Sequence, residues 1–307
     1  MKEVKIFSPA KINLFLNVLH KREDAYHEIE TVLQVIDIYD EVTLRDREKG
    51  IKIICPEEGV PRGKGNLAYR AAEIILRETE LDRGVEIEIK KEIPIAAGLG
   101  GGSSNAAAVL VGLKELWNLR SLTKERLQGL AKGLGMDVPF FIKGGRALGK
   151  GRGEELTPLR AGKSFWLTLI VPGFKVSTAW VYQSLNLDLT RKRKSLKIIM
   201  NDLKTRSGTD WSSILYNRLE EVTERKYPCV GRIKESLRAL GGVALMSGSG
   251  PAVFGIFPGR REAERAGAIL EGEFTNSPEV RKPGSGKEKV YVAKTFSGGI
   301  EVEKLKV

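Results

Sequence analysis

The sequence predicts an α+β protein of two domains, and three observations support this prediction. Strand-like segments are concentrated in the first third of the chain and helical segments follow, which is typical of α+β proteins and not of regular β–α alternation. The length of 307 residues exceeds what one hydrophobic core usually supports. Hydrophobic residues make up 41% and charged residues 29%, as in an ordinary globular protein. We expect the boundary within 155–165 and assign residues 1–158 and 159–307 to the two domains.

In the first domain, residues 11–19 alternate between apolar and polar side chains, which is the period of a strand with one buried face. Three more strand-like segments follow, at 41–45, 51–54 and 85–90. Asn66 stands where a helix N-cap belongs, because apolar residues at helical spacing begin directly after it. Further helices are expected after the glycine-rich turn that follows residue 94 and at 124–134.

The second domain is expected to open with an apolar strand at 165–171 and to contain mostly helices. Helical spacing is found at 178–185, 195–205, 211–226 and 230–240, and another helix is expected from residue 261. The remaining expected features are a strand on each side of a turn at 246–251, the second of them at 252–257, an exposed loop at 273–289 and a last strand near 289–295.

Composition and charge limit the function classes. Cys55 and Cys229 are the only cysteines, which excludes a disulfide framework and a cysteine-ligated metal cluster. No apolar run reaches the ~20 residues of a membrane-spanning helix, and Lys11 and Asn13 interrupt the N-terminal apolar stretch, so we expect a cytoplasmic protein. The net charge of +12 suits anionic metabolites or a nucleic acid. The run RKRK at 191–194 contains no aromatic residues, and we interpret it as a solvated loop.

Glycine and serine residues at 98–104 lie between an expected strand and an expected helix. Glycines adopt positive φ and let backbone N–H groups approach a ligand, and the first N–H groups of a helix have no partner within it. With the partial positive charge of the helix N-terminus, this arrangement favours a phosphate-binding loop over a flexible connector. The segment 144–151 nearly matches a P-loop, but Gly151 stands where the magnesium-binding Ser or Thr belongs. Neither a Rossmann fingerprint nor the protein-kinase motif set is present.

Three motifs resemble the signatures of the GHMP kinases, the superfamily of galactokinase, homoserine kinase and mevalonate kinase. They are SPAKINLFLNV at 8–18, PIAAGLGGGSSNAA at 94–107 and SGSGPAVFG at 247–255, and their order and spacing match over essentially the whole chain. The extra glycines of the second motif, together with REDAYHEIETV at 22–32, resemble the branch that phosphorylates a cytidine-diphosphate alcohol in the non-mevalonate route to isoprenoids. The resemblance implies a two-domain GHMP kinase fold with its active site in the interdomain cleft, and ATP and Mg²⁺ as cofactors.

By this resemblance, Lys11 and Asp137 are the catalytic pair. We expect Asp137 to orient the acceptor hydroxyl and to take its proton late, because a loose phosphoryl-transfer transition state needs little early deprotonation. We expect Lys11 to stabilise negative charge on the transferred group. From the residues alone two other interpretations stay open: a lysine at a strand edge that reaches solvent, and an aspartate that caps the short helix in which Pro139 takes an early position.

The resemblance also implies two sets of binding residues. The expected ATP-binding residues are Pro94, Ala97, Gly98, Leu99, Gly100, Gly101, Gly102, Ser103 and Ser104, of which Ser104 is also a candidate ligand of Mg²⁺. The expected substrate-binding residues are Asn13, Tyr26, His27, Asp137, Tyr182, Ser247, Gly248 and Gly250. Packing beside Trp180 and Leu185 is the alternative for Tyr182. Ala25 and Arg218 depart from the family pattern, which has glycine and aspartate there.

The expected function is therefore ATP-dependent phosphorylation of the 2-hydroxyl of a cytidine-diphosphate alcohol. Another GHMP kinase, of homoserine or mevalonate type, is the first alternative, because it shares the phosphate-binding motifs. A basic RNA-binding protein is the second, because the first half of the superfamily resembles a domain of ribosomal and translation proteins. The expected partners are the small-molecule acceptor and ATP, with no nucleic acid and no membrane, and the oligomeric state is left open.

Overall fold

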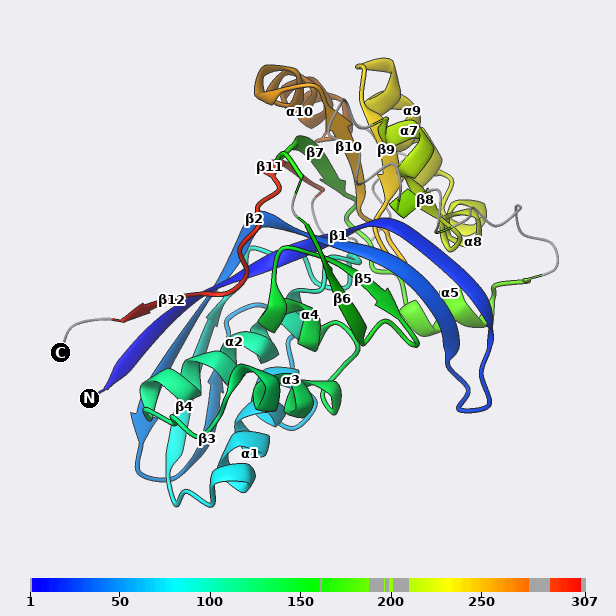
Figure 1. Cartoon of the computed structure of the whole chain (residues 1–307). Coiled ribbons are helices and arrows are strands. Elements are labelled where there is room, and N and C mark those ends of the chain that lie inside the picture. The colour runs from blue at the N-terminus through cyan, green and yellow to red at the C-terminus, as the bar shows by residue number, and fades with distance from the viewer. Residues whose placement is uncertain are drawn as a thin grey trace.

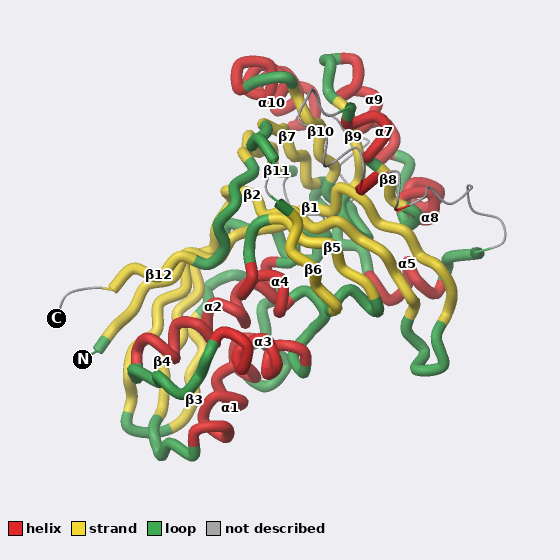
Figure 2. Tube along the Cα trace, viewed as in Figure 1, coloured by secondary structure: helices red, strands yellow, loops and turns green. Residues whose placement is uncertain are grey.

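The computed structural model describes residues 2–160, 162–187, 196, 199–200, 210–275 and 288–304. Two β-sheets with helices packed against them form the molecule, in agreement with the α+β prediction (Figure 1, Figure 2). The basic run at 191–194, and most of the expected helix at 195–205 and of the expected loop at 273–289, lie outside the described residues.

The first sheet has the long antiparallel hairpin of β1 (Glu3–Lys21) and β2 (His27–Arg47) at its centre. Its strand order is β12 (Glu301–Lys304), β1, β2, β4 (Gly84–Lys90), β3 (Gly50–Ile54), and from β2 a branch continues through β5 (Arg146–Lys150) to β6 (Glu155–Leu159). The short β8 (Tyr216–Asn217) pairs in parallel with β1. Because β8 and β12 come from the second half of the chain, both halves contribute to this sheet, and the domain boundary near residue 158 stays a prediction.

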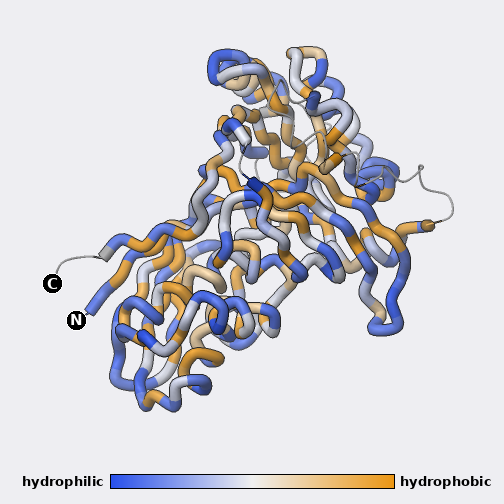
Figure 3. The backbone as a smooth tube through the Cα atoms, in the orientation of Figure 1, coloured by the Kyte–Doolittle hydropathy of each residue, from blue (hydrophilic) through white to orange (hydrophobic). Residues whose placement is uncertain are grey.

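Helices pack together on one face of the first sheet (Figure 1). They are α1 (Leu67–Thr79), α2 (Gly101–Leu116), α3 (Lys124–Lys132) and α4 (Val138–Lys143). The expected N-cap is confirmed, since Asn66 Oδ1 accepts from Ala68 N at 2.9 Å. The glycine-, alanine- and valine-rich α2 lies close against the sheet, and a Cβ on Gly112 would meet Leu44 and Ile6 at 2.6 and 2.7 Å. Hydrophobic residues run along the strands and inner helices, whereas the tip of the β1–β2 hairpin is hydrophilic (Figure 3).

The second sheet has the order β11 (Lys289–Lys294), β7 (Trp166–Val171), β10 (Val253–Phe257), β9 (Val243–Met246), and its neighbouring strands are antiparallel. Helices α9 (Cys229–Ala239) and α10 (Arg260–Thr275) pack against it, and α5 (Thr178–Gln183), α7 (Trp211–Ile214) and α8 (Glu220–Lys226) are the other described helices of this half. In the part of the chain that the structure describes, no helix is long and apolar enough to cross a bilayer.

The prediction of one helix over 211–226 is wrong, because β8 separates two short helices, α7 and α8, within this range. Asn217 belongs to β8, and its side-chain Nδ2 donates to the carbonyl oxygens of Met246 and Gly248 at 2.8 and 2.7 Å. These bonds tie the segment to the turn after β9, and strand pairing of β8 with β1 replaces helical hydrogen bonds there. Helical periodicity in a sequence does not register such long-range partners.

The expectation of one buried face for residues 11–19 is also wrong, since both faces of β1 are buried there until its last residues. β1 contacts α2, and Ile12 and Phe15 share a core cluster with Leu167 and Phe254 of the second sheet. Its polar residues are therefore buried and need partners inside the protein.

Three strands are longer than expected or were not predicted at all. β2 extends over His27–Arg47, although the sequence indicated a strand only at 41–45. β5 falls in the glycine-rich segment 144–151, where glycine weakens a strand pattern, and β6 contains a proline, which also disfavours a strand. β5 forms because β2 offers it a pairing edge.

Candidate active site

One cavity of about 1030 Å³ brings together segments that are distant in the sequence. Its wall includes the β1–β2 hairpin, the loop before α2, the residues before α4, helix α5 and the turn after β9. The expected site residues that line it are Lys11, Asn13, Tyr26, His27, Pro94, Ala97, Gly98, Leu99, Gly100, Gly101, Gly102, Ser103, Asp137, Tyr182 and Gly248. Ser104, Ser247 and Gly250 are not among the lining residues.

The glycine loop needs its glycines for close backbone approach. Gly98 and Gly100 have φ of +81° and +73°, and Ala96 has φ of +55°. A Cβ on Gly98 would lie 2.2 Å from the carbonyl oxygen of Ser247, and one on Gly100 would lie 2.8 Å from the Phe141 ring. Gly102 differs, because a Cβ there would meet no atom within 4 Å. Gly100 is the N-cap of α2, no side chain caps this helix, and its first residues line the cavity, so the helix N-terminus is placed to bind an anion there.

Lys11 is buried, with 4% of its surface exposed. Its Nζ donates to Asn13 Oδ1 at 2.6 Å and lies 3.6 Å from Asp137 Oδ2. Its backbone N–H donates to the carbonyl of Leu99 at 3.0 Å, which ties β1 to the glycine loop. The alternative of a strand-edge lysine that reaches solvent is therefore wrong.

Asp137 takes the N-cap position of α4 but does not act as a cap. Its φ and ψ of −86° and −13° are helical, and its side chain makes no capping hydrogen bond. The carboxylate is about one-third exposed (32%), lines the cavity and forms the ion pair with Lys11. The capping alternative is wrong, since the side chain is directed to Lys11 instead of to the helix N–H groups.

Three expected residues lie behind the cavity wall. Ser104 is fully buried, and its Oγ accepts from Ser8 Oγ at 2.7 Å, so the structure does not bring it to the cavity. Ser247 Oγ accepts from the N–H of Asn13 at 3.3 Å and donates to the carbonyl of Gly98 at 3.1 Å. A Cβ on Gly250 would lie 2.5 Å from Met246 Sδ. The turn after β9 thus holds β1 and the glycine loop together.

Aromatic side chains line the end of the cavity near the hairpin tip. The ring centroids of His27 and Tyr182 are 5.2 Å apart with planes at 32°, so Tyr182 packs on His27 across two elements. Arg152 lies over the Tyr26 ring at 5.1 Å, and half of Tyr26 is exposed. Ala25 has φ of +66°, a left-handed conformation that glycine adopts at less cost than alanine.

Burial sets the protonation of the two packed rings. Burial, and then the nearby Lys21, lowers the pKa of His27, so the imidazole is neutral at pH 7. Burial, and then Asp137, raises the pKa of the Tyr182 phenol, so this group keeps its proton. The site therefore offers neutral, polar aromatic rings at this end.

The sequence did not single out several polar residues that line the cavity. Thr31, Lys91, Arg152 and Thr178 are four of them. Lys91 stands in a pair of lysines directly before the loop, but the sequence does not say which lysine faces inward. Lysine or arginine lines the cavity at positions 11, 21, 91 and 152, whereas Asp137 is the only carboxylate among the described lining residues. The site therefore favours anionic ligands.

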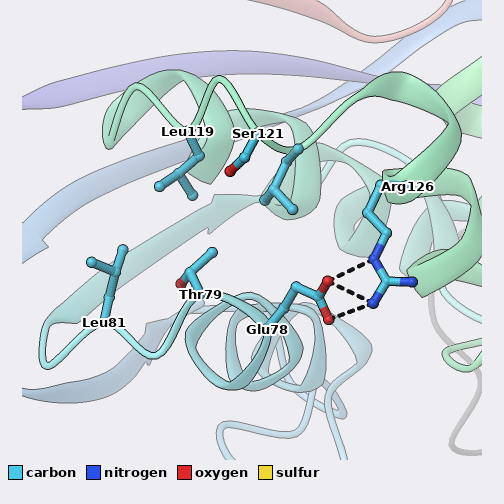
Figure 4. Close-up of a pocket in the computed structure, with 7 residues that line it drawn as sticks. Glu78, Thr79, Leu81, Leu119, Ser121 and Arg126 are labelled. Carbon is cyan, nitrogen blue, oxygen red and sulfur yellow. Dashed lines mark hydrogen bonds and ion pairs between the residues drawn. The ribbon is translucent and has the colours of Figure 1, made fainter.

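A second, smaller cavity of about 550 Å³ lies between α1 and the segment that precedes α3 (Figure 4). Its lining includes Leu81, Leu119 and the ion pair of Glu78 with Arg126, whose N–O distances are 2.6 and 2.7 Å. The charged groups of this cavity are paired with each other, and none of the expected site residues lies in it.

Comparison with known proteins gives the same family for both halves of the chain. The family model for the GHMP kinases N terminal domain matches residues 66–145, and the model for the GHMP kinases C terminal matches residues 199–276. The chain is 46% identical to the 4-diphosphocytidyl-2-C-methyl-D-erythritol kinase of Geobacter metallireducens over 87% of this chain and 93% of that protein. It is 41% identical to the enzyme of the same name from Alkaliphilus oremlandii over 98% and 100%.

Solved structures of other kinases share the fold of this chain. A crystal structure of 4-(cytidine 5'-diphospho)-2C-methyl-D-erythritol kinase matches with a TM-score of 0.78 and 33% identity over 96% of this chain and all of that one. Homoserine kinase from Cytophaga hutchinsonii matches with a TM-score of 0.75 and 19% identity over 99% of this chain and 98% of that one, which shows a shared fold only.

Proposed function

The chain belongs to the 4-diphosphocytidyl-2-C-methyl-D-erythritol kinases, a branch of the GHMP kinases, and from this premise we propose what its cavity does. It transfers the γ-phosphoryl group of ATP to the 2-hydroxyl of 4-diphosphocytidyl-2-C-methyl-D-erythritol, in the non-mevalonate route to isoprenoids. The observation that carries this proposal is the buried Lys11 beside Asp137 at 3.6 Å, next to the glycine loop.

The Lys11–Asp137 pair suits direct phosphoryl transfer. The acceptor oxygen bonds to the γ-phosphorus as the bond from that phosphorus to the ADP oxygen breaks. Asp137 holds the hydroxyl in line and accepts its proton, which suits a weak base in a loose transition state. Lys11 stabilises negative charge on the transferred group.

The ATP end of the cavity is proposed at the glycine loop. The N-terminus of α2 and the cationic side chains of the wall attract the triphosphate, and the open space beside Gly102 lets phosphate oxygens approach the backbone. Mg²⁺ is proposed to arrive with ATP, held mainly by phosphate and water oxygens. Among the described residues that line the cavity, Asp137 is the carboxylate that could bind the ion.

The acceptor end is proposed at the aromatic residues of the hairpin tip and α5. A cytosine ring stacks on aromatic faces with about 1–3 kcal/mol per contact. His27 and Tyr182 already touch each other, so the base is proposed to pack on this pair beside Tyr26, and not between the two rings. Asn13 and Gly248 line the same cavity, and Asn13 also accepts from Lys11.

The test is incubation of the protein with ATP, Mg²⁺ and 4-diphosphocytidyl-2-C-methyl-D-erythritol, followed by mass spectrometry of the alcohol. One added phosphoryl group is expected, and Asp137→Asn is the matched control for contaminating kinases. Uncytidylated methylerythritol, homoserine and mevalonate serve as competing acceptors. Equal or faster transfer to one of these would assign the chain to another GHMP activity, and no transfer to any of them by the folded protein would refute the proposal.

A further inference from the structure

We propose that Thr31 is a positioning residue of the transfer site, because it fixes the orientation of the Asn13 amide and, through it, the direction of the Lys11 ammonium. The inference rests on the proposed function. Thr31 lies on β2, whereas Asn13 and Lys11 lie on β1, and all three line the large cavity. Thr31 and Asn13 are 2% and 3% exposed, so neither relies on solvent for its hydrogen bonds.

The three side chains form one chain of hydrogen bonds. Thr31 Oγ1 donates to the backbone carbonyl of Phe15 at 2.8 Å, and Asn13 Nδ2 donates to Thr31 Oγ1 at 2.8 Å. Lys11 Nζ donates to Asn13 Oδ1 at 2.6 Å and lies 3.6 Å from Asp137. The hydrogen-bond chain thus starts at a backbone carbonyl of β1 and ends at the proposed catalytic ammonium.

The donors and acceptors of this hydrogen-bond chain can be arranged in only one direction. A hydroxyl has a single proton, so Thr31, which donates to the Phe15 carbonyl, can only accept from Asn13. The Asn13 amide therefore turns its NH₂ group to Thr31 and its oxygen to Lys11. The reverse orientation would set an NH₂ donor against an ammonium that has only donors, in a buried site where unmet donors are costly.

A β-bulge brings Thr31 to both of its partners. The pairing of β1 with β2 changes register between Asn13, which faces Leu33, and Phe15, which faces Val32. Bulges occur beside active sites, where they redirect side chains. Here the shift lets one threonine bind the Asn13 side chain and the Phe15 carbonyl together.

The consequence for Lys11 follows from the tetrahedral ammonium. One of its three N–H groups donates to Asn13 Oδ1 at 2.6 Å, whereas Asp137 Oδ2 lies 3.6 Å from Nζ, so the hydrogen bond to Asn13 limits how the other two N–H groups can turn. If Asn13 turns, this limit is lost and the ammonium is no longer held toward the group being transferred. Since the ammonium acts on charge that develops during transfer, turnover is expected to fall more than substrate affinity.

The test compares Thr31→Val, which keeps the shape and removes the hydroxyl, with Thr31→Ser, which keeps the hydroxyl. For Thr31→Val we expect kcat to fall roughly 10- to 100-fold with KM values nearly unchanged, and for Thr31→Ser most of the activity to remain. Thr43→Val is the matched control: Thr43 is a buried threonine of the same strand that is not among the described residues lining the cavity, and we expect normal kcat. Thermal unfolding of each variant sets an assay temperature at which all are folded.

A double-mutant comparison separates positioning from general packing. Because Thr31 acts through Asn13, Thr31→Val should cause no further loss of kcat in an Asn13→Ala background. The proposal would be overturned if Thr31→Val had a normal kcat, or if Thr31→Val and Thr31→Ser lost kcat equally. It would also be overturned if Thr31→Val lowered kcat in the Asn13→Ala background by the same factor as in the wild type.

An activity-independent measurement keeps this test distinct from that of the proposed function. In NMR spectra of isotope-labelled protein, the Asn13 side-chain NH₂ signals, assigned by their loss in Asn13→Ala, should exchange with solvent faster in Thr31→Val than in wild type. If the wild-type protein gives no phosphorylated product, the proposed function fails. If the Asn13 NH₂ protons exchange at the same rate in Thr31→Val as in the wild type, the role of Thr31 in holding the amide is refuted.

Discussion

Replacement of Gly98 by alanine tests whether close backbone approach explains the glycine loop. Gly98 has φ of +81°, and the new Cβ would lie 2.2 Å from the carbonyl oxygen of Ser247. Ordinary contact begins at 3.4 Å, so the loop or the turn after β9 must move by roughly 1 Å. We expect the free energy of unfolding to fall by about 2–4 kcal/mol, of which about 1–2 kcal/mol comes from the left-handed backbone.

The same displacement of the glycine loop in Gly98→Ala is expected to slow phosphoryl transfer. A misplacement of about 1 Å in a positioned site costs on the order of 10²-fold in rate, so kcat/KM for ATP should fall by that factor. Gly102→Ala is the matched control within the same motif, because its Cβ would meet no atom within 4 Å and it lies in the first turn of α2. We expect this variant to be as stable as wild type or up to about 1 kcal/mol more stable, with a raised KM for ATP.

Denaturant unfolding and a coupled assay of ADP release with varied ATP measure both effects. A Gly98→Ala protein as stable and as active as wild type would refute the argument from close approach. If Gly102→Ala leaves the KM for ATP unchanged, phosphate does not approach the backbone at that residue.

Three further predictions concern charged and titratable groups. Asp137→Asn and Lys11→Met should each lower kcat by roughly 10²–10⁴-fold with an unchanged circular dichroism spectrum, and near-normal turnover would remove that residue from the mechanism. Asp40 is fully buried, forms an ion pair with Lys91 and accepts hydrogen bonds from the backbone N–H groups of residues 92 and 93 at 2.9 and 2.8 Å. Asp40→Asn should therefore lower the free energy of unfolding by about 3–5 kcal/mol, because it leaves the buried Lys91 without its ion-pair partner. Denaturant titration measures this change. Because burial, and then Lys21, hold the pKa of His27 below the usual value of about 6.5, the KM for the acceptor should stay constant near neutral pH and rise only at a pH below that usual value, and a profile of the same shape in His27→Gln would contradict this assignment.

Much of the fold follows from local patterns. The α+β class, the cap at Asn66 and the strand before the glycine loop follow from residue periodicity and local hydrogen bonding, and the structure confirms them. β5 and β6 could not be predicted in this way, because β5 forms a strand where β2 offers it a partner, and β6 in turn pairs with β5. The break at Asn217 has the same cause, since its partners lie in the turn after β9.

The features of the site also fall into those that the sequence predicts and those that require the structure. The glycine loop was predicted from its own residues, and Lys11, Asp137 and the aromatic residues were predicted from the resemblance of the motifs. The sequence did not show that Ser104 is directed into the core, or that Thr31 holds Asn13. Those facts depend on hydrogen bonds between residues far apart in the chain.

The sequence by itself thus determined which chemical groups this protein carries and which short segments present them. Only the tertiary structure decided which groups face the cavity and how each is oriented. The physical reason is that a buried polar side chain takes the direction in which its partners lie. For β1 those partners are Thr31 of β2, Ser104 of α2 and Asp137, which stands at the start of α4.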